Sequence, residues 1–378
     1  MRAVVVHSSL NSAGGGERVA LAIIESLKEM GFAVDLVTVE PTDWEHLKRI
    51  AGFHVKPDRE RPLLPFRIGA FGIYMRIATA LKLLSSKKYD LVVNTHGDMI
   101  PVKADITYMH YPTFAVVTDK LENIKYTRST FWRVYFEPYR LLQKLFLKYM
   151  RNRSPVILTN SEYSKDAIRR HINRDAIILY PPVDVKDFIS VSNSKDREDM
   201  VIACGRFTPE KRFEVVLEVA RHLQDISFKI VGAHSGKVTK AYLRKLTRIT
   251  EEQKLKNVEL LVNYPKKKQI RLYSRAKVFL HPMRGEHFGI AVVEAMAAGL
   301  VPVVHKSGGP WYDIVMQGRY GLGFCDLEEA VAAVEKAIAN FHILCRKGID
   351  RARKFSKQFF IRQFKRIVER VLKMKSRG

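Results

Sequence analysis

The sequence predicts two α/β domains, each built on a doubly wound parallel sheet, in a chain of 378 residues. A chain of this length exceeds one ordinary hydrophobic core. Short apolar runs alternate with helical segments, which is the pattern of βαβ units. The alternation is interrupted at Tyr180–Asp184, where two prolines are followed by the polar stretch Ser190–Asp199. We therefore expect an N-terminal domain over residues 1–180, a linker, and a C-terminal domain over residues 185–355.

In the first half, the run RAVVVH (Arg2–His7) predicts a buried strand, and a glycine loop leads from it into a helix that ends at Gly31. Further strands are expected at residues 32–40, 89–95, 104–110 and 155–161. In such sheets, ligands bind beyond the carboxyl ends of the strands.

The second half repeats this alternation. Strands are expected at residues 200–206, 228–233, 258–264, 277–282 and 301–306, with helices at residues 214–224 and 327–341. The basic segment Ser356–Lys375 predicts a final helix, and we expect residues 356–378 to pack back on the N-terminal domain. With the two domains facing each other, a ligand would lie between the carboxyl ends of their strands.

The net charge of +26 favours a polyanionic partner such as nucleic acid, an anionic lipid surface or a phosphorylated small molecule. Basic residues concentrate in Arg67–Lys88, Lys125–Arg153 and the tail from Arg346 to Arg377. The first two alternate with apolar and aromatic residues, as in helices that lie in a bilayer interface. Ordinary amphipathic helices packed on a core are the alternative.

Composition also limits the cellular setting. The three cysteines show no CxxC spacing and no paired framework, which is typical of reduced thiols in a cytosolic protein. Met1 leads directly into a strand, so we expect no signal peptide, and no apolar run is long enough to span a bilayer. The expected location is the cytoplasm, peripheral on the cytoplasmic face of a membrane.

The most specific motif is the run EHFGIAVVE, in which Glu286 and Glu294 bracket a glycine. If a helix begins near Phe288, Glu294 lies about two turns into it and the carboxylates are up to ~12 Å apart. That is the reach from a sugar ring across a diphosphate to a ribose, with helix amides binding the phosphates. Glu294 stands among apolar residues, where an unpaired carboxylate would be costly. We assign the donor site to His287, Phe288, Gly289, Ile290 and Glu294, and a catalytic role to Glu286.

Two other loops follow strands and suit phosphate. Gly14, Gly15 and Gly16 open the first helix, where glycines let the backbone approach a phosphate closely. Arg206 and Lys211 follow the first strand of the second half and could clamp a diphosphate. The alternatives are a tight turn without a ligand and two solvated cations.

His110 closes a strand and is well placed to contact substrate, although a lone histidine is more often structural. His281 and His287 lie close to Glu286, but their spacing is not that of metal ligands, and no Asp-x-Asp is present. We expect chemistry without a metal ion and without a cofactor.

At these residues the sequence resembles the retaining glycosyltransferases of family 4, which have the two-domain GT-B fold. The resemblance rests on GGGERV, HYPT, ILTNSEYSKDAI, YPPVD, GRFTPEKR and the E-x7-E run followed by SGGP. Within the family, these motifs are most similar to the GDP-mannose-dependent α-1,2-mannosyltransferases of dolichol-linked oligosaccharide synthesis.

The resemblance implies roles for the candidate residues. Glu286 lies beside the transferred sugar, and Glu294 holds the donor ribose. Arg206 and Lys211 neutralise the leaving diphosphate. His110 contacts the sugar near the reacting carbon, while Gly15 and Gly16 approach the donor phosphate. The expected partners are a nucleotide sugar, a glycan or polyprenyl-phosphate-linked acceptor and an anionic membrane surface, not nucleic acid.

Other functions remain as alternatives. One is a glycosyltransferase that uses a UDP-sugar on another lipid or a soluble acceptor. A nucleotide-dependent oxidoreductase is disfavoured, because Val19 stands where the dinucleotide fingerprint requires glycine or alanine, even though Glu40 stands where a ribose-binding acid would. A basic nucleic-acid-binding protein is favoured only by charge, since no recognition motif is present. The sequence does not specify an oligomeric state.

Overall fold

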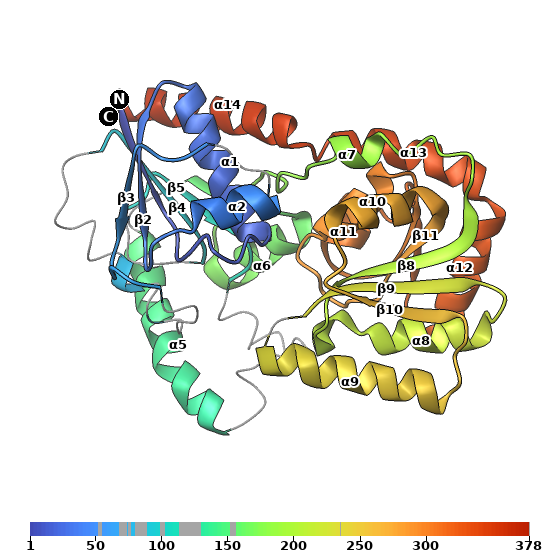
Figure 1. Cartoon of the computed structure of the whole chain (residues 1–378). Helices are drawn as coiled ribbons and strands as arrows, with labels where there is room; N and C mark the ends of the chain where they lie inside the picture. Colours follow the sequence, from blue (N-terminus) through green and yellow to red (C-terminus); the bar gives the residue numbers. More distant parts are fainter. Residues whose placement is uncertain are drawn as a thin grey trace. The chain divides into compact units, whose positions relative to one another are not determined.

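The computed structural model describes residues 1–51, 55–67, 74, 77–79, 89–98, 103–112, 130–151, 156–234 and 236–377. It divides into two compact units, which can be followed by colour in Figure 1. The first unit is Met1–Pro182 together with Lys357–Gly378, and the second is Val183–Ser356. The chain therefore passes between the units twice.

In the described part of the first unit, seven strands form one parallel sheet in the order β3-β2-β1-β4-β5-β6-β7. The strands are β1 (Arg2–Val6), β2 (Ala33–Thr38), β3 (Arg59–Pro62), β4 (Leu91–Gly97), β5 (Ile106–Met109), β6 (Val156–Thr159) and β7 (Ile177–Ile178). The strand order reverses between β1 and β4. In doubly wound sheets this reversal marks the place where ligands bind.

The helices of the first unit are α1 (Gly15–Glu29), α2 (Trp44–Ala51), α5 (Thr130–Arg151), α6 (Glu162–Ile172) and α14 (Lys357–Lys375). Alternate residues of β1 face opposite sides of the sheet, and both sets are buried: Ala3 and Val5 on one side, Val4 and Val6 on the other. Strands buried on both faces explain why the sequence shows continuous apolar runs.

Helix α14 completes the core of this first unit beside α1 (Figure 1). Phe360 and Phe364 share a hydrophobic cluster with the apolar residues of α1. Two ion pairs fix the helices, Lys357 with Glu25 at 2.9 Å and the Lys365 ammonium with a neighbouring α1 carboxylate at 2.6 Å. The last helix of the chain is thus part of the fold that the first residues begin.

Six strands, again counted over described residues, form the parallel sheet of the second unit in the order β10-β9-β8-β11-β12-β13. They are β8 (Glu198–Arg206), β9 (Ser227–Ala233), β10 (Val258–Val262), β11 (Ala276–His281), β12 (Val301–His305) and β13 (Leu322–Phe324). This order matches that of the first six strands of the other sheet, from β3 to β6, and its reversal lies between β8 and β11. The predicted fold class is confirmed.

The second unit has helices on both faces of its sheet. These elements are α7 (Lys186–Ile189), η2 (Pro209–Lys211), α8 (Phe213–His222), α9 (Gly236–Glu252), α10 (Lys266–Arg275), α11 (Ile290–Ala297), η3 (Pro310–Ile314), α12 (Leu327–Ala339) and α13 (Phe341–Arg353). Residues of α8, α9 and α12 join one face of the sheet in a single cluster.

The polar stretch Ser190–Asp199 lies inside the second unit. Arg197 orders this stretch, because its guanidinium donates to carbonyl oxygens of Ser192, Ala276 and Ala298 at 3.0, 2.6 and 2.6 Å. A polar sequence is here ordered by one half-buried arginine that satisfies several backbone carbonyls.

Of the basic segments, Arg67–Lys88 lies mostly outside the described residues. The segment Lys125–Arg153 is described from Thr130 to Arg151, where it forms α5. No helix in the described ranges combines the length and apolar character that a bilayer crossing requires.

Candidate active site

The Glu286 carboxylate is bonded to a lysine across the switch point of the second sheet. Lys211 lies in η2, directly after β8, and Glu286 follows β11. Lys211 Nζ donates to Glu286 Oε2 at 2.5 Å and also lies 3.2 Å from Met283 Sδ. His281 ends β11, with its Nε2 3.6 Å from the same carboxylate oxygen. The structure thus brings together Lys211, His281 and Glu286 from two adjacent strands.

The electrostatics of this cluster keep Glu286 ionised. Burial alone raises the pKa of the Glu286 carboxyl, but the Lys211 ammonium and the His281 ring outweigh burial and hold this pKa well below its usual range. Burial lowers the pKa values of His281 and His287, so both rings are neutral near pH 7. Glu286 is therefore suited to accept hydrogen bonds and to stabilise positive charge, and unsuited to donate a proton.

Glu294 has a lysine partner of its own. It is the fifth residue of α11, and its side chain is only 8% exposed. Lys266, the first residue of α10, donates to Glu294 Oε1 at 3.0 Å. The same ammonium lies 4.3 Å from the centre of the Phe188 ring. This cation stabilises a carboxylate in an otherwise apolar helix.

Lys266 was not among the residues predicted from the sequence, although a signal was present. Helix α10 begins with Lys266, Lys267 and Lys268 and has no acidic residue in its first turn. Cations at a helix N-terminus oppose the macrodipole. Such a local violation is expected where a side chain serves a site.

A half-buried thiol lies near Glu294. Cys204 is in β8, and Gln269 Nε2 lies 3.2 Å from its Sγ. Burial and the nearby Glu294 charge raise the pKa of the Cys204 thiol to about 11. This cysteine is therefore an inert packing residue.

The backbone conformation at the start of α11 explains why glycine occupies this position. Gly289 caps the helix with φ of +100°, and a Cβ there would lie 2.9 Å from Pro310 Cγ. The helix begins at Ile290, later than predicted, so Glu294 lies about one turn in. Phe288 is buried against Phe355, with ring centroids 5.5 Å apart, which leaves its backbone as the part able to contact a donor.

The glycines of the SGGP motif hold a second loop against the first. A Cβ on Gly308 would lie 2.3 Å from the Glu286 carbonyl oxygen, and one on Gly309 would lie 2.4 Å from the His287 carbonyl oxygen. The Gly309 N–H donates to the Glu286 carbonyl at 2.8 Å. Because these two glycines have no side chain, their backbone packs directly against the segment that carries Glu286 and fixes it.

Arg206 and Lys211 share one loop but have different surroundings. Arg206 ends β8 and is exposed, and within the described residues no ion pair engages its guanidinium. A Cβ on Gly205 would lie 3.2 Å from Lys211 Cδ and Cε, so this glycine leaves room for the lysine stem. The exposed cation is placed for a ligand, while Lys211 already contacts Glu286.

In the first unit, the glycine loop and His110 meet at the carboxyl ends of β1, β4 and β5. Gly14 caps α1, which begins at Gly15. A Cβ on Gly16 would lie 3.1 Å from His110 Nε2, and one on Gly97 would lie 2.4 Å from His110 Cδ2. The backbone N–H of His110 donates a hydrogen bond to the Gly97 carbonyl oxygen at 3.0 Å. The imidazole is packed between Gly97, where a side chain would clash with it, and Gly16, where a side chain would force the ring to shift.

A carboxylate beneath the glycine loop was missed by the sequence analysis. Glu17 lies in the first turn of α1, and its Oε1 is 3.9 Å from His7 Nε2. His7 Nδ1 lies 2.8 Å from the Thr95 carbonyl oxygen, which assigns the Nδ1 proton to that bond. Burial raises the pKa of Glu17, but the nearby His7 ring and a hydrogen bond from Ser12 outweigh burial and lower this pKa to about 2. The acidic residue that ends the GGGE motif was the sequence signal for this carboxylate.

Glu40, the residue of the dinucleotide alternative, serves the fold. Ser9 Oγ and Asn11 Nδ2 donate to its Oε1 at 2.7 and 3.0 Å, and the residue is buried. This carboxylate ties the loop after β1 to the end of β2. Among the described residues, no group of three or more His, Cys, Asp or Glu side chains is arranged to hold a metal ion.

Comparisons with known proteins extend over nearly the whole chain. Residues 13–187 match the family described as Glycosyltransferase Family 4. Residues 184–355 match the family described as Glycosyl transferases group 1.

Curated relatives are named GDP-Man:Man(3)GlcNAc(2)-PP-Dol alpha-1,2-mannosyltransferase. The protein from Dictyostelium discoideum is 25% identical over 72% of this chain and 60% of the relative. The human protein is 28% identical over 71% of this chain and 61% of the relative. The Xenopus laevis protein is 30% identical over 55% of this chain and 48% of the relative. The chain thus spans about half to three fifths of the length of these relatives.

Solved structures support the fold. Sucrose-phosphate synthase from Thermosynechococcus elongatus has a TM-score of 0.73 at 18% identity, covering 99% of this chain and 100% of that one. Anabaena Alr3699/HepE in complex with UDP and glucose has a TM-score of 0.70 at 14% identity, covering 98% and 99%. With both family matches, these likenesses show that the chain belongs to the glycosyltransferases of the GT-B fold, with a family 4 region followed by a group 1 region.

Proposed function

We propose that the protein is a retaining mannosyltransferase that moves mannose from GDP-mannose onto a glycan or polyprenyl-linked acceptor at the cytoplasmic face of a membrane. The observation that carries the proposal is the pair of lysine-bound carboxylates, Glu286 and Glu294, at the switch point of the second sheet. The names of the curated relatives supply the donor and the class of acceptor.

The donor diphosphate is assigned to the second unit. Arg206 is exposed at the carboxyl end of β8, and the first amides of α11 lie after Gly289. An arginine fork and a helix N-terminus are both favourable partners for phosphate oxygens. Glu294 at the other end of the run accepts hydrogen bonds from the ribose hydroxyls, with Lys266 holding its second oxygen.

Glu286 is assigned to the sugar side. Its low pKa keeps it anionic, so it stabilises the positive charge that develops on the sugar as the bond to the diphosphate breaks. Lys211, bonded to Glu286, also faces the growing negative charge of the leaving diphosphate. His110 of the first unit is the proposed contact to the sugar near the reacting carbon.

The proposed step balances without a metal ion or a cofactor. The bond between the anomeric carbon and the diphosphate oxygen breaks, and the acceptor oxygen bonds to the same face of that carbon. The acceptor proton passes to the departing diphosphate oxygen. No second carboxylate is needed as a base, unlike in a hydrolase.

Calorimetric titration with GDP, UDP and ADP tests the donor. We expect GDP to bind at least about tenfold more tightly than the others, a difference of about 1.4 kcal/mol. The Arg206→Ala, Lys211→Ala double variant should bind GDP several-fold more weakly. Preference for UDP would instead support a UDP-sugar-dependent transferase.

The acceptor and the chemistry need a second assay. Transfer from GDP-mannose to a polyprenyl-diphosphate-linked glycan should proceed in the presence of a chelator and give an α-linked product. A β-linked product would overturn retention, and loss of turnover with the chelator would overturn metal independence.

A further inference from the structure

Helix α5 carries an apolar stripe on its solvent side. Val134, Leu141 and Leu145 are 67%, 52% and 63% exposed. Steps of seven and four residues place them on one side of an α-helix, and the exposed Pro138 lies between them. We call these four residues the α5 stripe. Figure 1 shows one end of α5 projecting past the strands of the first unit.

The opposite face of α5 already provides its packing in the first unit. Phe136 and Tyr139 are buried in a cluster with Tyr74 and Ile77. The Tyr139 hydroxyl donates to Asp98 Oδ2 at 2.9 Å, just after β4. The aromatic inner face therefore anchors the helix, and the α5 stripe contributes nothing to that anchoring.

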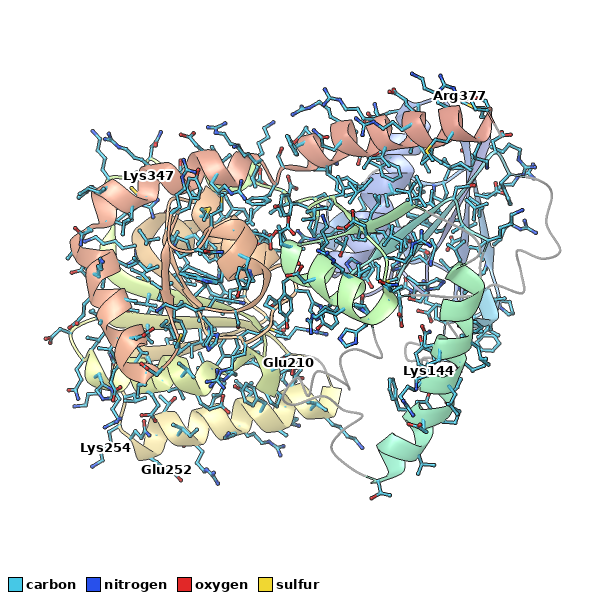
Figure 2. The ribbon with its side chains drawn as sticks, turned by 180° about the vertical axis from the view of Figure 1, so that it is seen from behind. Lys144, Glu210, Glu252, Lys254, Lys347 and Arg377 are labelled. Carbon is cyan, nitrogen blue, oxygen red and sulfur yellow. The ribbon has the colours of Figure 1, made fainter. Side chains whose placement is uncertain are left out.

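The charge around the stripe identifies its partner. The α5 sequence contains five basic residues and one acidic residue. The acidic residue, Glu137, is paired with Arg140 on the same helix. Lys144, labelled in Figure 2, is exposed next to Leu145. An aliphatic stripe in a cationic helix matches a bilayer interface, where apolar side chains enter the acyl boundary and cations meet anionic headgroups.

We propose that the α5 stripe inserts into the interface of an anionic lipid bilayer and docks the first unit on it. This inference rests on the proposed function and deepens it, since a polyprenyl-linked acceptor is presented at such a surface. The occupant is the lipid surface, recognised by apolar insertion together with anionic headgroups.

Vesicle cosedimentation tests the proposal with the full chain. The probes are vesicles of phosphatidylcholine alone and of phosphatidylcholine mixed with phosphatidylglycerol. We expect binding to the anionic vesicles and weaker binding as salt is raised. The Val134→Gln, Leu141→Gln, Leu145→Gln variant should partition at least about tenfold less, because binding scales with buried apolar area.

A matched control removes three equally exposed apolar side chains elsewhere. Val238, Ile343 and Met374 are 58%, 65% and 68% exposed on α9, α13 and α14. The Val238→Gln, Ile343→Gln, Met374→Gln variant should bind vesicles like the unmodified chain. The proposal would be overturned if both triple variants lost vesicle binding equally, or if both bound vesicles as well as the unmodified chain. It would also be overturned if the chain bound an acidic protein but no vesicles.

Two further measurements keep the outcome decisive. If the triple variant does not fold, Leu141→Gln and Leu145→Gln alone should each lower partition about threefold, and no change in either would refute insertion. GDP titration of the same proteins separates this proposal from the proposed function. If the chain binds GDP but not vesicles, only the proposal for the α5 stripe is refuted. If it binds vesicles but not GDP, only the assignment of the donor is refuted.

Discussion

The two units share a strand order but hold their candidate residues by different means. At the switch point of the second unit, Lys211 and Lys266 are bonded to Glu286 and Glu294. At the switch point of the first unit, His110 is held by close packing against Gly16 and Gly97. One scaffold thus supports a site organised by charge and a site organised by close packing.

Removing the negative charge at Glu286 should have the largest effect. Glu286→Gln keeps the shape but loses the anion that faces the developing positive charge, so we expect turnover to fall roughly 100- to 1000-fold. GDP affinity should change little. Glu259→Gln is the matched control, because Glu259 pairs with Lys229 at 2.8 Å on an exposed surface. Unchanged turnover in Glu286→Gln would remove this residue from the site.

Crowding His110 tests the site organised by packing. In Gly16→Ala the new Cβ would lie 3.1 Å from His110 Nε2, so the ring must shift. We expect roughly tenfold lower kcat, because a small misplacement at a reacting centre is costly. Gly31→Ala is the control, since it strains a φ of +81° with nothing within 4 Å. Equal activity of the two variants would contradict the role of this contact.

Breaking the Lys266–Glu294 pair should have a moderate effect. Lys266→Met leaves a buried carboxylate without its cation, and we expect GDP to bind several-fold more weakly while kcat with saturating donor is kept. Lys245→Met breaks the exposed pair with Glu214, which has a 2.7 Å contact, and serves as the control. A loss of kcat without a loss of affinity would place Lys266 in the chemistry rather than in donor binding.

Acid titration tests a contribution to stability, not to activity, in the first unit. The folded pKa of Glu17 is about 2, below its ordinary value of 4.5. A depressed carboxyl pKa stabilises the fold above pH 4.5, and this contribution, about 3 kcal/mol, is lost as the pH falls towards 2. The gap in unfolding free energy between the unmodified chain and Glu17→Gln should therefore shrink with acidification. A constant gap from neutral pH to about pH 3 would exclude this linkage.

Local patterns in the sequence were enough to predict the fold class. Continuous apolar runs such as Arg2–Val6 gave the buried strands, and turn residues gave their ends. The edge strand Arg59–Pro62 was missed because RERP has no apolar pattern; charged edge strands are a common defence against pairing with other chains.

The candidate site was predictable only as a set of residues. The E-x7-E spacing is local and visible, whereas the partners of its carboxylates are not. Lys211 and Glu286 lie 75 residues apart, and His7 reaches Thr95 across 88 residues. Such pairings depend on which strands become neighbours, and a single sequence does not state that order. Burial then decides their pKa values, which no motif contains.

The return of α14 to α1 has a consequence for biosynthesis. Phe360 and Phe364 fill the core of the unit that begins with Arg2, so the whole of the second unit must emerge from the ribosome before that core can close. Until then, the part of α1 that α14 covers stays open to solvent in a nascent chain. Chaperone dependence during translation should therefore concentrate on the segment synthesised first, and a chain shortened before Lys357 should aggregate through it.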